Sequence, residues 1–213
     1  MKLSLPRSQF VASALAAASL STTLQPRSAI AADGKMDAKM AYQPSLQGKG
    51  YGKTEMDYSD FQRLPSGVLF KDAKTVAGGK TPAAGDRIVV DWSGYTIGYF
   101  GRPFETKQLR SLDGIEEGFL RFEVGGGSMI PALEQGVLGM SEGSIRQIVV
   151  FPEQGYPASD PGHAKVGPKP STFSGQRALD FVLQNKELID KTLLFNVKCI
   201  RVDKPGENGW KKA

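Results

Sequence analysis

Residues 128–156 read SMIPALEQGVLGMSEGSIRQIVVFPEQGY, and this stretch decides the fold of the chain. Pro131 is favoured in the first turn of a helix, and Gly139 is suited to end one. The apolar face between them is formed by Ile130, Leu133 and Val137. Residues 144–151 then alternate as a half-buried strand does. The stretch therefore predicts a short helix, a turn and a strand that ends at a Gly-Tyr-Pro corner.

Strand signals flank this stretch on both sides. Short runs of branched and aromatic residues, bounded by glycine and proline, are typical of strands. The predicted strands are residues 68–71, 87–95, 104–107, 120–124, 144–151 and 192–201. The core face of the last of these is predicted to be Leu193, Phe195, Val197 and Cys199. Because strands and helices do not alternate regularly, we predict an α+β domain in which a curved antiparallel sheet wraps around one short helix.

A second helical segment is predicted before the last strand. Within residues 175–191, Leu179, Val182 and Leu183 fit one helical face. We expect this addition to cover an edge of its own domain, because exposed apolar patches of that size are uncommon on monomers. The alternative is that it docks a partner protein.

The first 31 residues carry the features of a cleavable targeting segment. Lys2 and Arg7 precede an apolar run at residues 10–20, and small residues before the junction predict cleavage after Ala31. The run is shorter than the ~20 residues that cross a bilayer, which argues against a membrane anchor. A first helix of the folded domain is the alternative. The pattern fits the second half of a plastid presequence, and it also fits a signal for the periplasm or the secretory pathway.

The remaining 182 residues divide into three parts. The whole chain of 213 residues is 40% hydrophobic, which is enough for one globular domain plus extensions. Residues 32–63 are polar and are predicted to be a flexible linker, residues 64–202 form the domain, and residues 203–213 form a tail. We expect the tail to be a frayed end, with Trp210 as an alternative anchor for a partner.

Charge gives no sign of a nucleic-acid partner. The chain has 27 basic and 22 acidic residues, and loss of Lys2, Arg7 and Arg27 with the N-terminus leaves 24 against 22. Such a balance lacks the basic footprint that phosphate backbones require.

Neither a metal site nor a cofactor site is predicted. His163 is the single histidine and lies in a loop, where we expect it to face solvent. Cys199 is the single cysteine, so no internal disulfide can form, and its place in an alternating strand predicts a buried, unreactive thiol. No zinc-binding spacing can be built from these residues.

The chain resembles the FKBP-type peptidyl-prolyl cis-trans isomerases. The motifs that carry the resemblance are residues 128–156, Val-Asp-Trp-Ser-Gly at 90–94 and Arg-Pro-Phe-Glu at 102–105. The resemblance covers residues 67–202, and it implies an enzyme without a cofactor that acts on bonds preceding proline in polypeptides.

A narrower resemblance follows from the helical addition. PSTFSGQRALDFVL at 170–183 and LIDKTLLF at 188–195 are similar to the plant and algal branch of the family that resides in the thylakoid lumen. The resemblance implies localisation in that lumen and assistance to protein folding or assembly there. Its implied partners are lumenal photosynthetic proteins, with at most peripheral membrane contact.

The matching motifs imply a proline-binding groove. By position, Tyr156 corresponds to the tyrosine whose hydroxyl holds the substrate carbonyl. The implied walls and entrance of the groove are Phe104, Phe122, Met129, Ile130 and Phe195, and the backbone amide at the entrance binds ligands in the family. The alternative is that Phe122 and Phe195 belong only to the core.

Four positions depart from the family pattern. Trp92 replaces a tyrosine and Glu105 an aspartate, and we expect the Trp92 indole N–H and the Glu105 carboxylate to keep a buried donor–acceptor pair. Leu133 replaces the tryptophan floor, and Leu120 replaces an aromatic wall. Each lost aromatic contact is worth about 0.5–1.5 kcal/mol, or roughly tenfold in rate. We therefore predict weak catalysis with Tyr156, Glu105 and Trp92, and poor macrolide binding. The alternative is an inactive binding or scaffold module.

Overall fold

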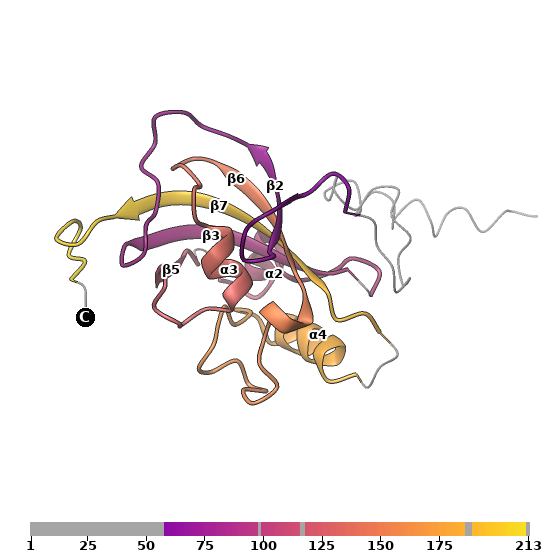
Figure 1. The fold of residues 1–213 in the computed structure, drawn as a ribbon. Helices are drawn as coiled ribbons and strands as arrows, with labels where there is room; N and C mark the ends of the chain where they lie inside the picture. The colour runs from indigo at the N-terminus through magenta and orange to yellow at the C-terminus, as the bar shows by residue number, and fades with distance from the viewer. Residues whose placement is uncertain (1–57, 98, 116–117, 186–188, 212–213) are drawn as a thin grey trace, which may run out of the picture. The chain divides into compact units, whose positions relative to one another are not determined.

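The computed structural model describes residues 58–97, 99–115, 118–185 and 189–211 (Figure 1). The predicted targeting segment and the predicted linker up to residue 57 lie outside them. In the described residues, the strands are β1 (Gln62–Arg63), β2 (Leu69–Lys74), β3 (Arg87–Thr96), β4 (Arg102–Glu105), β5 (Leu120–Glu123), β6 (Ile145–Val150) and β7 (Leu193–Asp203). The helices are α2 (Lys107–Leu112), α3 (Pro131–Gly136) and α4 (Phe173–Leu183), with a 3-10 turn, η2, at Pro152–Gln154.

The strands form one antiparallel sheet in the order β1-β2-β6-β7-β3-β4, and β5 pairs with the first half of β3. The last strand of the chain, β7, is central, because it pairs with β3 on one side and β6 on the other. Figure 1 shows the curved sheet with α3 lying across one face and α4 near the end where β7 begins. The α+β prediction of one short helix against a curved antiparallel sheet is confirmed.

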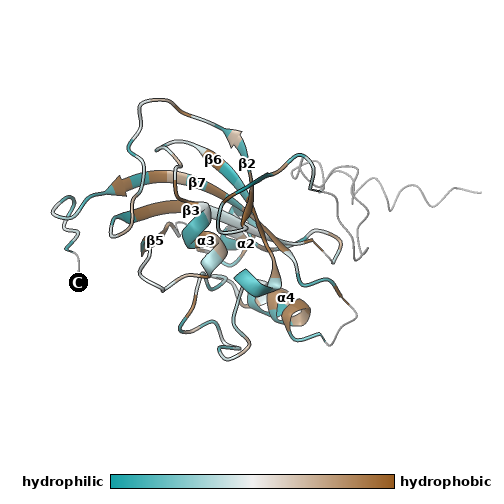
Figure 2. Ribbon diagram, in the orientation of Figure 1, coloured by the Kyte–Doolittle hydropathy of each residue, from teal (hydrophilic) through white to brown (hydrophobic). Residues whose placement is uncertain are grey.

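The main core lies between α3 and the sheet. The predicted core face of β7 is confirmed, since Leu193, Phe195, Val197 and Cys199 are all buried. On α3, Leu133 is fully buried, and Gly136 allows the helix to lie close to β6. A Cβ atom at Gly136 would lie 2.5 Å from Cδ1 of Ile148. Figure 2 shows hydrophobic residues along the strands beneath α3 and polar residues on the turns.

The opposite face of the sheet carries a smaller cluster that the strand pattern did not predict. Leu194 is fully buried there, together with Leu69, Ile97 and Val149. Tyr58 and Phe61 pack against this cluster, and the Tyr58 ring meets the rings of Phe61 and Phe151 edge-on at 5.8 Å. The prediction of a flexible linker up to residue 63 is therefore wrong for residues 58–63, because aromatic side chains fix them to the domain.

Two predicted elements also have different bounds in the structure. The strand predicted at 104–107 ends at Glu105, because the Thr106 side chain accepts a hydrogen bond from Leu109 N (3.2 Å) and caps α2. The predicted second helix begins earlier and ends at Leu183, with Thr172 as its N-cap. Its apolar residues Ala178, Leu179 and Val182 are buried, which confirms that α4 covers an edge of its own domain. A bilayer-spanning helix is absent from the residues that the structure describes.

The C-terminal tail is bound to the domain, so the prediction of a frayed end is wrong for residues 204–210. The Trp210 indole N–H donates to Gly85 O (3.3 Å), and the Arg87 guanidinium lies over the Trp210 ring. Arg87 also pairs with the fully buried Asp203 at 2.8 Å. Burial alone would raise the pKa of Asp203, but hydrogen bonds from Asn208, Arg87 and Arg201 together hold it below its usual value. The tail thus closes the end of the sheet where β7 finishes.

We expect Cys199 to be unreactive in the folded protein. Burial, with a smaller contribution from the charge of Glu142, raises the pKa of the thiol to about 11. At pH 8 only about one thiol in a thousand is then ionised, and the thiolate is the reactive form. Iodoacetamide should therefore leave the native protein unlabelled at pH 8 and label it after unfolding in urea. Rapid labelling of the native protein, followed by mass spectrometry, would contradict this expectation.

Candidate functional site

The predicted groove residues converge on the face of the sheet that α3 covers. They come from β3, β4, β5, β7, α3 and the segment that leads into it, and the loop after η2, most of which are far apart in the sequence. Within one hydrophobic cluster, the buried members are Trp92, Phe104, Phe122, Ile130, Leu133, Tyr156 and Phe195, with Leu120 and Met129 partly buried against them. The fold therefore brings together every apolar residue of the predicted site.

Three aromatic rings form the centre of this cluster. Trp92 lies 6.1 Å from Phe104 and 5.1 Å from Phe195, measured between ring centroids, and the two phenylalanines are 5.9 Å apart. Tilted and edge-on pairs of this kind are stabilising beyond their burial. Gly94 makes room for them, because a Cβ atom there would lie 2.3 Å from Cζ of Phe104. Sequence reasoning assigned Gly94 no role, although it stands in the Val-Asp-Trp-Ser-Gly motif.

Tyr156 places a hydroxyl at the edge of this cluster. Its side chain is buried, and the O–H donates to the backbone carbonyl of Pro168 at 2.5 Å. Burial, together with the nearby negative charge of Glu105, raises the pKa of the Tyr156 hydroxyl well above its usual value. The group therefore keeps its proton, and it acts as a hydrogen-bond donor throughout the physiological pH range.

Glu105 is held by partners other than the one predicted. Its carboxylate accepts hydrogen bonds from Ser171 N (2.7 Å) and Ser171 Oγ (2.8 Å), and it lies 3.5 Å from Arg110 Nη1. Among the hydrogen bonds of the described residues, none joins Trp92 to Glu105, so that expected pair is not formed. The reason is that Ser171, which leads into α4, supplies donors that the sequence pattern did not place near Glu105.

The entrance to α3 provides a second donor. The backbone N–H of Ile130 donates to Gly167 O at 2.7 Å, and the N–H of Gly167 donates to Ser128 O at 2.9 Å. Met129 and Gly167 thereby form an isolated parallel bridge. The Ile130 amide, which the family motif assigns to ligand binding, thus donates to the Gly167 carbonyl, next to the Pro168 carbonyl that Tyr156 binds.

Comparison with known proteins identifies the family. A protein-family model described as FKBP-type peptidyl-prolyl cis-trans isomerase matches residues 78–200. The chain belongs to this family. The residues that match the FKBP model include β3 to β6, α3, the Tyr156 loop, α4 and most of β7.

Two Arabidopsis thaliana proteins are similar in sequence. The chain is 49% identical to "Peptidyl-prolyl cis-trans isomerase FKBP19, chloroplastic" over 168 residues, which cover 78% of this chain and 64% of that protein. It is 30% identical to "Peptidyl-prolyl cis-trans isomerase FKBP17-1, chloroplastic" over 100 residues, 46% of this chain and 43% of the relative. The chain thus spans less than two thirds of the length of the relatives it matches.

Two solved structures match with low similarity. FkpA from Escherichia coli aligns with a TM-score of 0.44 and 21% identity, over 81% of this chain and 64% of FkpA. A peptidyl-prolyl cis-trans isomerase from Pseudomonas syringae pv. tomato aligns with a TM-score of 0.44 and 17% identity, over 82% of this chain and 93% of that chain.

The sequence led us to expect that His163 faces solvent, and this prediction is wrong because its side chain is buried. The residue is only 6% exposed, its ring packs on Tyr156 at 4.5 Å, and its Nε2 lies 3.0 Å from Oδ1 of Asp180 on α4. Because a carboxylate accepts, Nε2 carries the proton in this pair. No signal near His163 predicts the contact, since its partner belongs to α4. Within the described parts of the chain, no group of three His, Cys, Asp or Glu side chains is suited to hold a metal ion.

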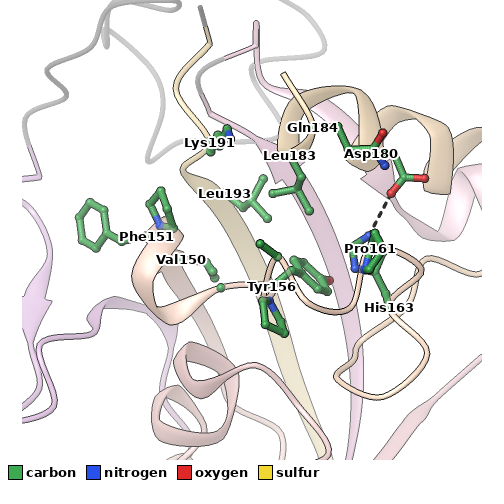
Figure 3. A pocket seen from close by; sticks show the side chains of 14 residues that line it. Val150, Phe151, Tyr156, Pro161, His163, Asp180, Leu183, Gln184, Lys191 and Leu193 are labelled. Atoms are coloured by element: carbon green, nitrogen blue, oxygen red, sulfur yellow. Dashed lines mark hydrogen bonds and ion pairs between the residues drawn. The ribbon is translucent and has the colours of Figure 1, made fainter. Parts of the chain in front are cut away.

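A cavity of about 520 Å³ lies in this FKBP domain, with Tyr156 in its wall (Figure 3). Its lining includes Tyr156 and His163 on one side, Leu183 of α4 on another, and Leu193 at the start of β7. Of the predicted site residues, only Tyr156 lines it. Tyr156 is thus shared between the hydrophobic cluster of predicted site residues and the cavity.

Proposed function

We propose that the chain is a peptidyl-prolyl cis-trans isomerase of low activity that acts on proline-containing polypeptides. The observation that supports it is the buried Tyr156 hydroxyl beside the Trp92, Phe104 and Phe195 rings, in a chain of the FKBP family. This arrangement brings apolar rings and a hydroxyl that can bind a carbonyl into one cluster, which other residues of the protein cover in this structure.

The chemistry requires no nucleophile. Rotation about an amide costs about 18–20 kcal/mol, because the twisted bond loses its resonance. An apolar groove keeps water from the bond, and donors placed at the carbonyls bind the twisted form more strongly than the planar one. In this proposal Tyr156 O–H and Ile130 N–H hold substrate carbonyls, while the aromatic rings hold the proline. Glu105 positions the site through its hydrogen bonds to Ser171.

The low rate follows from two positions. Leu133 and Leu120 stand where the family pattern has aromatic side chains. Each loss removes about 0.5–1.5 kcal/mol of ring contact, roughly tenfold in rate where the contact acts in the transition state. Poor binding of the family's macrolide ligands follows from the same loss. Turnover of a proline peptide at the rate of isomerases with both aromatic residues would refute this part of the proposal.

We expect Tyr156→Phe to lower kcat/KM for isomerisation by about tenfold, because it removes one hydrogen bond to the substrate carbonyl and leaves the ring in place. A protease-coupled assay on a proline-containing peptide measures the change. Tyr99→Phe is a matched control, because Tyr99 packs on Phe100 and Phe181 outside the groove cluster. If both variants turn over substrate like the wild type, Tyr156 does not have the proposed role.

The proposed location is the thylakoid lumen of the chloroplast, where the protein would assist the folding or assembly of lumenal proteins, photosynthetic proteins among them. Both similar Arabidopsis proteins are named chloroplastic, and residues 170–183 resemble the lumenal branch of the family. A fluorescent tag on the full-length precursor tests the location. A signal outside plastids would refute it.

The second candidate function is a binding module without catalysis. It is favoured by the burial of the groove, since Phe104, Leu133 and Phe195 are fully buried. Exposed aromatic side chains, Phe173 and Phe181 on α4, offer another contact surface. The isomerase assay separates the two functions, because a scaffold would show no turnover in wild type or Tyr156→Phe while still capturing its partner.

A further inference from the structure

Both donors that the proposed function assigns to substrate are occupied by the chain itself. Ile130 N–H donates to Gly167 O (2.7 Å), and Tyr156 O–H donates to Pro168 O (2.5 Å). The two acceptors are consecutive carbonyls of one segment, residues 166–170, with the sequence Val-Gly-Pro-Lys-Pro. A polypeptide substrate that used these donors would have to displace this segment.

The segment lies against the groove as a peptide ligand would. Pro168 and Pro170 are buried, while Lys169 between them is exposed. The Gly167 N–H donates to Ser128 O (2.9 Å), so the segment also pairs with the backbone that leads into α3. Backbone pairing with alternate side chains directed into the protein is a common mode of peptide recognition.

Hydrogen bonds on both flanks hold the segment in place. Upstream, the Asp160 carboxylate accepts the backbone N–H groups of Ala164, Lys165 and Val166. Downstream, Ser171 is bound to Glu105, and Gln176 Nε2 donates to Pro170 O at 3.0 Å. The segment is therefore positioned by the folded domain, and it remains near the donors even when its central contacts break.

The fit at Gly167 limits what can lie in this place. A Cβ atom on Gly167 would come within 3.2 Å of both Cε and Sδ of Met129, which is closer than an ordinary contact. The Met129 side chain would have to shift to admit even alanine. The entrance therefore fits glycine before the proline without rearrangement, and it fits a larger residue only after the end of the Met129 side chain moves.

We propose that residues 166–170 are an internal ligand that closes the proline-binding groove, and that the groove favours external Gly-Pro segments. This inference rests on the proposed role of Ile130 and Tyr156 in substrate binding. A tethered segment competes at an effective concentration in the millimolar range. The apparent affinity for an external polypeptide is reduced in proportion to the fraction of molecules whose groove is open.

The test compares Pro168→Ala with Pro161→Ala in the full-length chain. The first removes the buried ring that holds the segment, and the second makes the same change at an exposed proline of the same loop. Two measurements report opening: hydrogen exchange of the Ile130 amide by NMR, and calorimetric binding of the peptide Val-Gly-Pro-Lys-Pro-Ser. We expect Pro168→Ala to raise both the exchange rate and the peptide affinity by about tenfold, and Pro161→Ala to change neither.

Each outcome decides the inference. Equal Ile130 exchange in the two variants would overturn it, and so would faster exchange without tighter peptide binding, because the freed donors would then not form a ligand site. Tighter peptide binding without isomerisation in any variant supports the internal ligand and refutes the proposed catalysis. Isomerisation that is measurable in the wild type and unchanged in Pro168→Ala would leave the catalysis standing and overturn the internal ligand.

Gly167→Val is the second variant, and it decides the question if Pro168→Ala does not fold. A Cβ atom at this position already lies 3.2 Å from Cε and Sδ of Met129, and the two further methyl groups of valine need more room than the small shift of Met129 that suffices for alanine, so the segment is displaced without loss of the proline. We expect the same tenfold rise in Ile130 exchange and in affinity for the glycine-containing peptide. Wild-type behaviour in both measurements would overturn the inference.

Discussion

Replacement of Gly175 by alanine is expected to destabilise the domain by about 3 kcal/mol. A Cβ atom at this position would lie 2.0 Å from the backbone carbonyl oxygen of Phe104 and 2.8 Å from Oγ1 of Thr172. A backbone atom cannot rotate away, so the start of α4 must separate from β4. Helix propensity alone would predict the opposite change in stability, because it favours alanine over glycine by about 1 kcal/mol.

Urea unfolding followed by circular dichroism measures this effect. Gly162→Ala is the matched control, because no atom lies within 4 Å of its added Cβ and its backbone does not require glycine. It should remain within about 0.5 kcal/mol of the wild type. A Gly175→Ala protein as stable as this control would show that α4 does not pack against β4 as described.

Replacement of Arg146 by methionine should cost about 3 kcal/mol. Its guanidinium pairs with Asp72 through Nε at 2.7 Å and Nη2 at 3.0 Å. Its Nη1 donates to the carbonyls of Gly136 and Leu138, at 3.0 and 2.9 Å, where α3 ends. Methionine keeps much of the apolar stem, but it leaves these carbonyls without their donor and Asp72 without its cation.

Arg121→Met is the control for this change, because Arg121 is exposed on β5 and, among the residues that the structure describes, donates only to Phe119 O. We expect the control to be within about 0.5 kcal/mol of the wild type in urea unfolding. Because α3 carries Leu133 into the groove, Arg146→Met should also weaken binding of a proline peptide. If Arg146→Met is as stable as the control, the carbonyls at the end of α3 accept hydrogen bonds from water in place of Arg146.

Local pattern was sufficient for the main core. Alternation along residues 192–201 identified the buried face of β7, and Pro131 marked the start of α3, because each signal is contained in a few consecutive residues. The helix ends at Gly136, before the predicted end at Gly139. Leu194 lies on the other face of β7, which the pattern did not assign to the core, and it is fully buried. The residues that cover it, Tyr58 and Phe61, stand in a polar stretch with no periodicity.

The groove lining was predicted by motif position, whereas its hydrogen bonds were not. Trp92 and Glu105 had been expected to pair, but Glu105 binds Ser171 across 66 residues of chain. His163 had been expected in solvent, but it meets Asp180 on a helix that forms later in the sequence. Partners of this kind depend on how α4 docks, and no spacing within the sequence encodes that placement.

The central position of β7 has a consequence for the order of folding. The last strand to be synthesised joins β3 to β6, so two groups of strands, β2 with β6 and β3 with β4 and β5, keep open edges until it arrives. Open edges of this kind recruit other chains. The sheet can therefore be completed only after synthesis has passed residue 203, and a chain cut before Leu193 should aggregate rather than fold.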